Sequence, residues 1–347
     1  MNTAWLWAYL RVFGAAVLIT LVLTPCVRWL APKLGAMDHP SAVKIHLRAT
    51  PRLGGAAIFC GFLISLLGLG IITESQKGVL IGAILAHGIG FLDDTRSVPA
   101  AIKLAALFVI TAFLARSGVM VHLCPFPVVN FILTLLWIVG VTSAFNAMDH
   151  MDGLAAGLTF FASLAYAYVS FQNGQWAWGL MSVALMGSSL GFLAYNFPPA
   201  SIFMGDSGSF FLGYLLAAMS IMGIWSTNPM KSMFVPVFIL GLPIFDLIYT
   251  VIRRQRNRVT RSLNQIVTFS GKDHFSHRLL KMGMTQRQAL FFSYAAAFAL
   301  SLGAVTIRYV FKVEAILLAV QYLITIFLIV ILMEFVDRKS KKPIESR

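Results

Sequence analysis

The chain has 347 residues, of which 59% are hydrophobic and only 12% are charged. A soluble domain carries about twice that charged fraction, so the composition excludes an ordinary soluble protein and favours a polytopic membrane protein. In a soluble protein, the formal net charge of +14 would suggest a nucleic-acid partner. Here the basic residues gather in a few loops between apolar segments. Membrane topology and anionic membrane lipids explain them, and we expect no nucleic-acid partner.

Apolar stretches that are long enough to cross a membrane as helices recur along most of the chain. They predict an all-α, polytopic integral membrane protein with about 11 transmembrane helices. The predicted spans lie roughly at 8–30, 54–73, 78–92, 99–116, 127–145, 153–171, 176–195, 209–226, 232–251, 288–307 and 314–336.

The distribution of Lys and Arg predicts the orientation of these spans. All but six of the 27 Lys and Arg residues lie at or near one set of loops, which makes that side cytoplasmic. The N-terminus is then outside and the C-terminus is cytoplasmic. We therefore expect a single integral membrane domain over 1–347, with its site built from cytoplasmic loops. These loops are 31–53, 93–98, 146–152, 196–208 and 252–287.

Two adjacent carboxylates, Asp93 and Asp94, close the third predicted span. Neighbouring carboxylates repel each other, so such a pair suits a bound Mg²⁺ ion or a general base. The alternative is a solvated helix end, with Arg96 as the local partner.

A second polar cluster contains Asn146, Asp149 and Asp152, spaced three residues apart. If the segment is helical, the three side chains share one face. An amide and two carboxylates on one face suit a ribose, a base edge or a hydrated metal. The alternative is a polar corner in which Asp152 caps the next helix.

A third cluster opens the eighth span, where Phe203 precedes Gly205 and Asp206. A helix N-terminus favours an anion or a metal-bound phosphate, and Phe203 is an aromatic side chain that suits stacking on a nucleobase. The alternatives are a plain N-cap for Asp206 and an interfacial anchor for Phe203.

Basic residues accompany the acids. The basic residues that surround these acids include Lys44, Arg52 and Lys103, and then His274, His277 and Arg278. Two His and an Arg within five residues resemble a phosphate clamp, whereas the other loop Arg residues fit the positive-inside rule. Asp246 falls inside the ninth span, and we expect it to be structural, with Arg253 as its partner.

Taken together, these motifs resemble the polyprenyl-phosphate N-acetylhexosamine-1-phosphate transferase family, from Lys44 to Arg278 and in family order. The Thr50 to Gly55 segment and the Asp273 to Arg278 segment look more like the undecaprenyl-phosphate N-acetylglucosamine-1-phosphate branch. Two departures leave the sugar open: residues 274–277 read His-Phe-Ser-His rather than a run of His, and His150 replaces a usual Gly.

The resemblance implies a transferase of the inner (plasma) membrane with its active site facing the cytoplasm. It would move N-acetylhexosamine 1-phosphate from a UDP-sugar to polyprenyl phosphate, releasing UMP, with Mg²⁺ as cofactor and Mn²⁺ as the alternative. Asp93 and Asp94 would lie beside the lipid phosphate, one of them as base, and Asp206 would ligate the metal. A metal role for the Asp pair and a homodimer both stay open.

The other residues would bind the donor. By the same resemblance, Phe203 would stack on uracil, Asp152 would contact its edge, and Asn146 and Asp149 would shape the nucleotide pocket. The basic residues would hold phosphates or sugar.

Two rival functions remain. Phospho-muramoyl-pentapeptide transfer belongs to a related branch of the family. A cation-coupled transporter would also need membrane carboxylates, but it would place them near the bilayer midplane rather than at span ends on one side.

Overall fold

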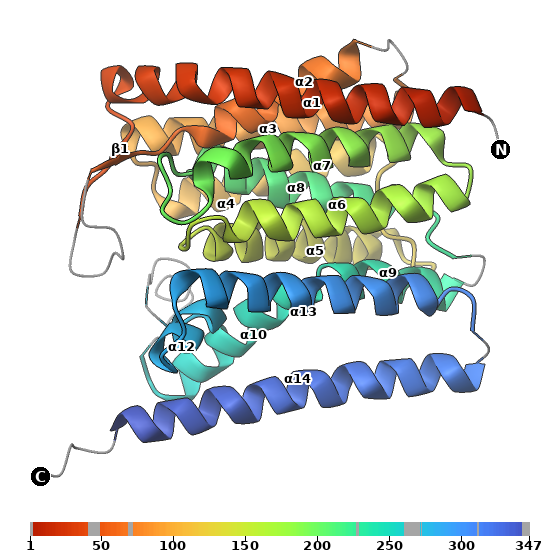
Figure 1. The fold of residues 1–347 in the computed structure, drawn as a ribbon. Coiled ribbons are helices and arrows are strands. Elements are labelled where there is room, and N and C mark those ends of the chain that lie inside the picture. The colour runs from red at the N-terminus through yellow and green to blue at the C-terminus, as the bar shows by residue number, and fades with distance from the viewer. Residues whose placement is uncertain are drawn as a thin grey trace, which may run out of the picture. The chain divides into compact units, whose positions relative to one another are not determined.

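The fold is that of a computed structural model, which describes residues 3–40, 49–68, 72–226, 229–259, 271, 273–310 and 312–341. The described chain is mostly α-helical, as the composition predicts (Figure 1). It divides into two compact units, Met1–Trp225 and Ser226–Arg347, and each unit is described by itself.

The first unit is a bundle of eight described helices. They are α1 (Thr3–Leu30), α2 (Gly54–Leu67), α3 (Glu74–Arg96), α4 (Ala100–Arg116), α5 (Pro127–Met148), α6 (Leu154–Gln172), α7 (Trp176–Asn196) and α8 (Asp206–Met222). A short 3-10 helix, η1 (Ala31–Leu34), follows α1. Helix α7 packs against α1, α2 and α6, while α8 packs against α3, α5 and α2.

The second unit contains α9 (Pro229–Ile239), α10 (Gly241–Arg256), α12 (Phe275–Lys281), α13 (Gln286–Thr306) and α14 (Lys312–Lys341). Helices α9 and α10 bend by 75° where they meet. The predicted ninth span is therefore broken.

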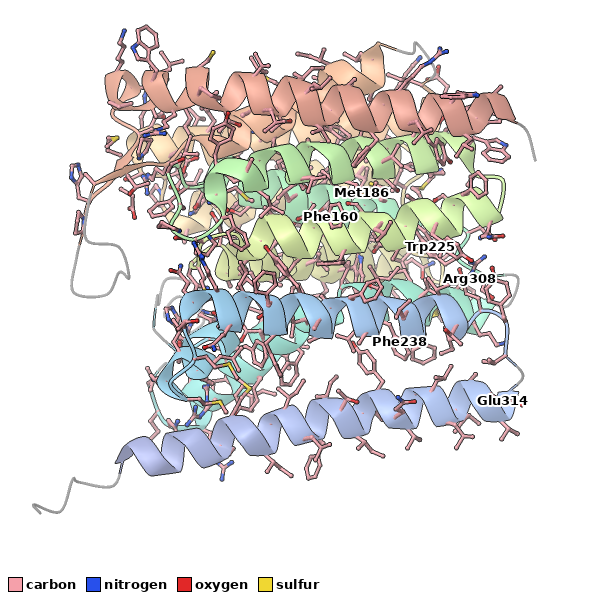
Figure 2. The ribbon with its side chains drawn as sticks, in the orientation of Figure 1. Phe160, Met186, Trp225, Phe238, Arg308 and Glu314 are labelled. Atoms are coloured by element: carbon pink, nitrogen blue, oxygen red, sulfur yellow. The ribbon has the colours of Figure 1, made fainter. Side chains whose placement is uncertain are left out.

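Seven described helices are long and apolar enough to cross a membrane, or eight if the bent pair forms one span. A described helix nevertheless lies at each of the eleven predicted positions, because each apolar run favours helix. The difference arises from length: α2, α4 and α8 have 14, 17 and 17 residues. Large apolar side chains point outward along the helices, as expected of a surface that faces lipid (Figure 2). The chain is a multi-pass membrane protein.

Helix α8 forms the core of the first unit. Every side chain from Ser207 to Ser220 is buried, so this helix is covered on all sides. A helix that is apolar all round belongs in a core. Its first residue, Asp206, is only partly buried, so the polar end of the central helix is the accessible one.

A small antiparallel sheet joins strand β1 (Met37–Asp38) to β2 (Thr50–Pro51). Arg52 extends β2 into a parallel bridge with Phe203, and the Phe203 amide donates to the Pro51 carbonyl. Gly54 and Gly55 then donate to the carbonyls of Phe203 and Met204. The end of the first loop, from Pro51 to Gly55, is thus fixed to the segment that leads into α8.

Candidate active site

The carboxylate of Asp94 caps α8 from a neighbouring helix. Asp94 is 1% exposed, and its two oxygens accept hydrogen bonds from the backbone amides of Asp206 and Ser207, each 2.9 Å long. The first amides of a helix have no partner within the helix. Asp94 therefore satisfies two of them and fixes where Asp206 begins α8.

Two glycines allow α3 and α8 to meet this closely. A Cβ on Gly90 would clash with the backbone carbonyl of Asp206. Gly205 has a φ of 76°, a conformation that L side chains rarely adopt, and a Cβ there would meet the Asp94 carboxylate. These contacts explain why glycine stands at both positions.

His87, about two turns before Asp94 on α3, supports the same contact between α3 and α8. Its Nδ1 lies 3.0 Å from the carbonyl oxygen of Ser207, and its ring stacks on Phe59 with centroids 4.2 Å apart. His87 precedes Asp94 by seven residues, so both side chains face α8.

Lys103 links the first carboxylate of the pair to α8. Its ammonium nitrogen lies 3.1 Å from Oδ2 of Asp93 and 2.8 Å from Oδ2 of Asp206. The other oxygen of Asp93 accepts from the amide of Val98 at 2.6 Å. All three charged side chains are largely buried, so this cation and the two carboxylates form a partly desolvated cluster.

Asn146 and Asp149 complete the cluster. The amide nitrogen of Asn146 lies 3.3 Å from Oδ2 of Asp206, and Asp149 hydrogen-bonds to the backbone of Gly205. Burial, followed by the negative charges of Asp206 and Asp94, raises the pKa of Asp149 well above its usual range. The structure thus brings together Asp93, Asp94, Lys103, Asn146, Asp149 and Asp206, which sequence spacing alone does not place side by side.

The segment that contains Asn146, Asp149 and Asp152 is not one helix, so the condition for a shared helical face is not met. Helix α5 ends at Met148, so Asp149 is its C-cap and Asp152 lies in the following turn. There Oδ2 of Asp152 accepts from the amide of Ala200 at 3.0 Å. The alternative, in which Asp152 caps α6, does not hold either, since the N-cap of this described helix is Gly153 and no side chain caps it.

An anion does sit at the first amides of α8, as a helix N-terminus favours, but it is the carboxylate of Asp94. The amides of Asp206 and Ser207 donate to Asp94, and those of Gly208 and Ser209 donate to the carbonyl of Gly205. A phosphate at this end would therefore be held by side chains rather than by these backbone amides.

Arg52 and Phe203 flank the cluster. The guanidinium of Arg52 donates to the carbonyl oxygens of Asp93 and Asp94, at 3.4 and 3.2 Å. A cation at these carbonyls also stabilises the C-terminal end of α3. Phe203 is partly buried and pairs through its backbone with Arg52.

The remaining basic candidates lie in the second unit or outside the described residues. His274, His277 and Arg278 are buried at the start of α12. Lys44 falls in the segment 41–48, outside the described residues.

The partner expected for Asp246 is wrong. Asp246 is fully buried, and its oxygens contact His274 Nδ1 at 2.7 Å and the amide of Phe275 at 2.5 Å. Arg253 instead approaches Glu334 at 3.8 Å. The sequence could not show this, because the partners of Asp246 follow it by 28 and 29 residues.

The acidic cluster fits a divalent cation. Asp93 and Asp206 both pair with the ammonium of Lys103. A third carboxylate, Asp149, is close enough for its charge to interact with that of Asp206. In the part of the chain that the structure describes, no three His, Cys, Asp or Glu side chains form a ready cage. Mg²⁺ usually binds through one or two carboxylates and completes its shell with waters and substrate phosphates, so this donor set suits it.

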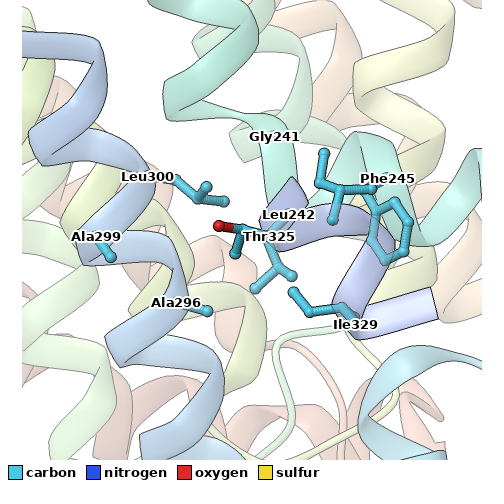
Figure 3. A pocket seen from close by; sticks show the side chains of 9 residues that line it. Gly241, Leu242, Phe245, Ala296, Ala299, Leu300, Thr325 and Ile329 are labelled. Carbon is cyan, nitrogen blue, oxygen red and sulfur yellow. The ribbon is translucent and has the colours of Figure 1, made fainter. Parts of the chain in front are cut away.

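An apolar cavity of about 60 Å³ lies within the second unit (Figure 3). Its lining comes from α10, α13 and α14, and includes Leu242, Phe245, Leu300 and Ile329. Such a lining does not suit a nucleotide sugar.

In the helix that ends in the Asp pair, the sequence predicts a close backbone approach at Gly90 and a packed, hydrogen-bonded His87, and the structure confirms both. Sequence reasoning missed one residue that joins the surrounding loops, Asn196. Asn196 gave no comparable signal: its amide bridges the amide of Gly153 and the carbonyl of Ile202, each at 2.9 Å. It thereby joins the loop of Asp152 to the loop of Phe203.

Fold and site together define a multi-pass membrane protein with a buried acidic cluster suited to a divalent cation. A family model described as glycosyl transferase family 4 matches residues 77–224, the part of the chain that contains all six residues of this cluster.

Similar proteins agree with this match. A Bacillus subtilis (strain 168) protein, named probable undecaprenyl-phosphate N-acetylglucosaminyl 1-phosphate transferase, is 35% identical over 306 residues, which cover 85% of this chain and 84% of that protein. A Mycobacterium tuberculosis (strain H37Rv) decaprenyl-phosphate N-acetylglucosaminephosphotransferase is 33% identical, covering 80% and 77%. A Staphylococcus carnosus phospho-N-acetylmuramoyl-pentapeptide-transferase is 31% identical, covering 60% and 74%. The chain belongs to glycosyl transferase family 4.

Proposed function

We propose that this protein transfers N-acetylglucosamine 1-phosphate from UDP-N-acetylglucosamine to a polyprenyl phosphate in the membrane. An oxygen of the lipid phosphate attacks the β-phosphorus of the donor. The bond from that phosphorus to the bridging oxygen breaks, so that UMP leaves and a polyprenyl-diphosphate sugar forms. The observation that carries the proposal is the convergence of Asp93, Lys103 and Asp206 on one point at the accessible end of α8.

Asp93 is the residue that we assign to the lipid phosphate, as the general base. One of its oxygens is held by the Val98 amide and the other points to Lys103, so the carboxylate is oriented toward the cluster. Lys103 would bind a phosphate oxygen, because its ammonium is the cation that both carboxylates share. Asp94, with two amide hydrogen bonds, holds α8 rather than substrate.

Asp206 and Asp93 would hold Mg²⁺, which would neutralise charge on the diphosphate during transfer. Asp152 and Phe203 belong to two loops that Asn196 joins, an arrangement that supports a uracil site between an aromatic ring and a carboxylate. Asn146 and Asp149 would bound the nucleotide pocket. The role of phosphate or sugar ligand, which the family resemblance implies, is also proposed for Lys44, His274, His277 and Arg278.

We also propose eleven membrane crossings, an outside N-terminus, a cytoplasmic C-terminus and a cytoplasmic site at the inner (plasma) membrane. The Lys and Arg asymmetry supports this orientation, since all but six of the 27 lie on the proposed cytoplasmic side. The clustering of Asp93, Asp149 and Asp206 agrees with it, because these residues were assigned to that side without reference to their charge.

A donor panel tests the function. Purified protein with polyprenyl phosphate and Mg²⁺ receives UDP-N-acetylglucosamine, UDP-N-acetylgalactosamine or UDP-muramoyl-pentapeptide, and the lipid product is identified by mass. We expect UMP and a lipid diphosphate sugar with the first donor. A product only with the pentapeptide donor would assign the chain to the related branch, and no product with any donor would refute the transferase assignment.

A further inference from the structure

Asp246 is a buried carboxylate that the proposed reaction does not use. It lies in α10, within the bent pair α9–α10, and is 0% exposed. A carboxylate in such a position is costly unless hydrogen bonds or a charge compensate it. The hydrogen bonds that compensate it come from His274 and Phe275 at the start of α12, 28 and 29 residues later in the chain.

Two residues of α10 hold three consecutive residues of the α12 entry. Asp246 contacts His274 and Phe275, and Arg254 forms a bidentate pair with Asp273, with nitrogen–oxygen distances of 2.7 and 2.6 Å. Asp246 and Arg254 are eight residues apart, so they lie on one side of α10. Burial raises the pKa of Asp273, but the hydrogen bonds and charge of Arg254, together with smaller contributions from its neighbours, bring the pKa below its usual value. The α12 entry is thus fixed by charge-assisted bonds rather than by apolar packing alone.

These contacts also assign the proton on the imidazole of His274. A carboxylate only accepts hydrogen bonds, so Nδ1 of His274, 2.7 Å from Asp246 Oδ2, carries the proton. Nε2 lies 3.5 Å from the guanidinium nitrogen of Arg254, which only donates. The ring therefore stands in a chain in which Arg254 donates to His274 and His274 donates to Asp246.

We propose that Asp246 is a positioning residue: its carboxylate sets the ring orientation and the tautomer of His274, and with them the ligand geometry of the α12 entry. The proposal rests on the proposed function, in which the α12 entry binds phosphate or sugar. Nδ1 of His274 is taken by Asp246, so Nε2, which Arg254 contacts only at 3.5 Å, is the atom that would accept a hydrogen bond from a sugar hydroxyl. Carboxylates that orient a functional imidazole act in the same way at other sites.

The Asp246→Asn variant keeps the size of the side chain and changes the bonding. The amide of Phe275 can only donate, so the Asn oxygen turns to it and the Asn nitrogen faces Nδ1 of His274. The imidazole then has to carry its proton on Nε2, where it opposes the donor of Arg254. The side chain still fits, but the chain of hydrogen bonds is reversed.

Imidazole ¹⁵N spectra of the full-length protein in nanodiscs, with the signal assigned by His274→Gln, measure the tautomer directly. We expect protonated Nδ1 in the wild type and a shift toward protonated Nε2 in Asp246→Asn. A wild-type His274 protonated on Nε2 instead would overturn the proposal, even if the variant cannot be obtained folded. This readout does not depend on activity, so it separates failure of the proposal from failure of the proposed function.

A double-mutant cycle supplies the kinetic test. Asp246→Asn should lower kcat for UMP release roughly tenfold or more. In the His274→Gln background the same change should cost less than about twofold, because its target is gone. The control is Ser293→Ala, which removes a buried hydroxyl bonded to the carbonyl of Ala289 in α13 and should leave kcat unchanged. Equal losses in both backgrounds would mean that Asp246 acts only through stability, against the proposal.

Discussion

The carboxylate of Asp94 lies 2.9 Å from the backbone nitrogen of Asp206, which follows it by 112 residues. The neighbouring carboxylate, Asp93, bonds to Lys103 instead. Two adjacent residues of the same type therefore have different tasks. Asp94 fixes the start of α8, and Asp93 faces the charged cluster.

This division predicts different outcomes for two matched substitutions. Asp94→Asn places an NH₂ group against a backbone donor, so we expect it to lower the free energy of unfolding by about 1–3 kcal/mol. Asp93→Asn should abolish UMP release while changing thermal stability much less. Thermal unfolding and a UMP assay of both variants check this. Full activity of Asp93→Asn would refute its assignment as base.

A glycine pair on α3 tests the close approach of α3 and α8. A Cβ on Gly90 would meet the backbone of Asp206, whereas nothing lies within 4 Å of a Cβ on Gly88. We expect Gly90→Ala to cost about 1–3 kcal/mol of unfolding free energy through overpacking. Gly88→Ala should be neutral or slightly stabilising, as alanine favours helix. Comparable melting temperatures for the two variants would contradict the packing.

Divalent cation binding can be measured without substrate, by Mn²⁺ electron paramagnetic resonance. The ammonium of Lys103 competes with a metal for Asp93 and Asp206, so Lys103→Met should bind Mn²⁺ more tightly, on the order of tenfold. The same variant should lose UMP release, because the proposed phosphate ligand is absent. Asp206→Asn should bind Mn²⁺ more weakly, whereas Glu74→Gln, in an exposed pair with Lys77, is the neutral control. Unchanged Mn²⁺ binding in Asp206→Asn would remove Asp206 from the metal site.

The raised pKa of Asp149 predicts how stability depends on pH. A carboxyl group with a pKa higher in the folded than in the unfolded state favours folding at low pH. This contribution is present below the unfolded pKa of about 3.9 and is lost as the pH rises through the folded value. Asp149→Asn cannot ionise and should therefore be more stable than the metal-free wild type at pH 8, with a smaller difference at pH 5. Melting temperatures at both pH values check this, and a difference that shrinks with rising pH would contradict it.

Two exposed arginines at opposite ends of neighbouring helices test the proposed topology. Arg96 ends α3, and Arg116 ends α4. In a chain without its three native cysteines, Arg96→Cys should react with an impermeant thiol reagent from the cytoplasmic side. Arg116→Cys should react from the outside. Labelling of both from the same side would refute the proposed orientation.

The helices of this fold could be predicted from the sequence because each apolar run is long and bounded by polar residues. The meeting of Asp93, Asp149 and Asp206 could also be expected, since all three follow or precede spans at the same side. The 75° bend between α9 and α10 could not, because the apolar pattern continues across Leu240 without interruption.

What sequence spacing did not predict was which polar atoms pair. The spacing of Asn146, Asp149 and Asp152 suggested a helical face, but α5 ends at Met148 and the chain turns. Asp94 and Asp246 each find their backbone partner far along the sequence, in a helix entry that no local pattern identifies. Tertiary capping of this kind depends on the packing of helices and not on the residues near the cap.

Lys103 gives the acidic cluster a counter-ion of its own. Because its ammonium lies between Asp93 and Asp206, part of the repulsion between these carboxylates is relieved by the polypeptide itself. We therefore predict that the protein folds and assembles this site without a metal ion, and that the metal binds afterwards. Prolonged treatment with a chelator should therefore silence the enzyme reversibly and leave its helices intact.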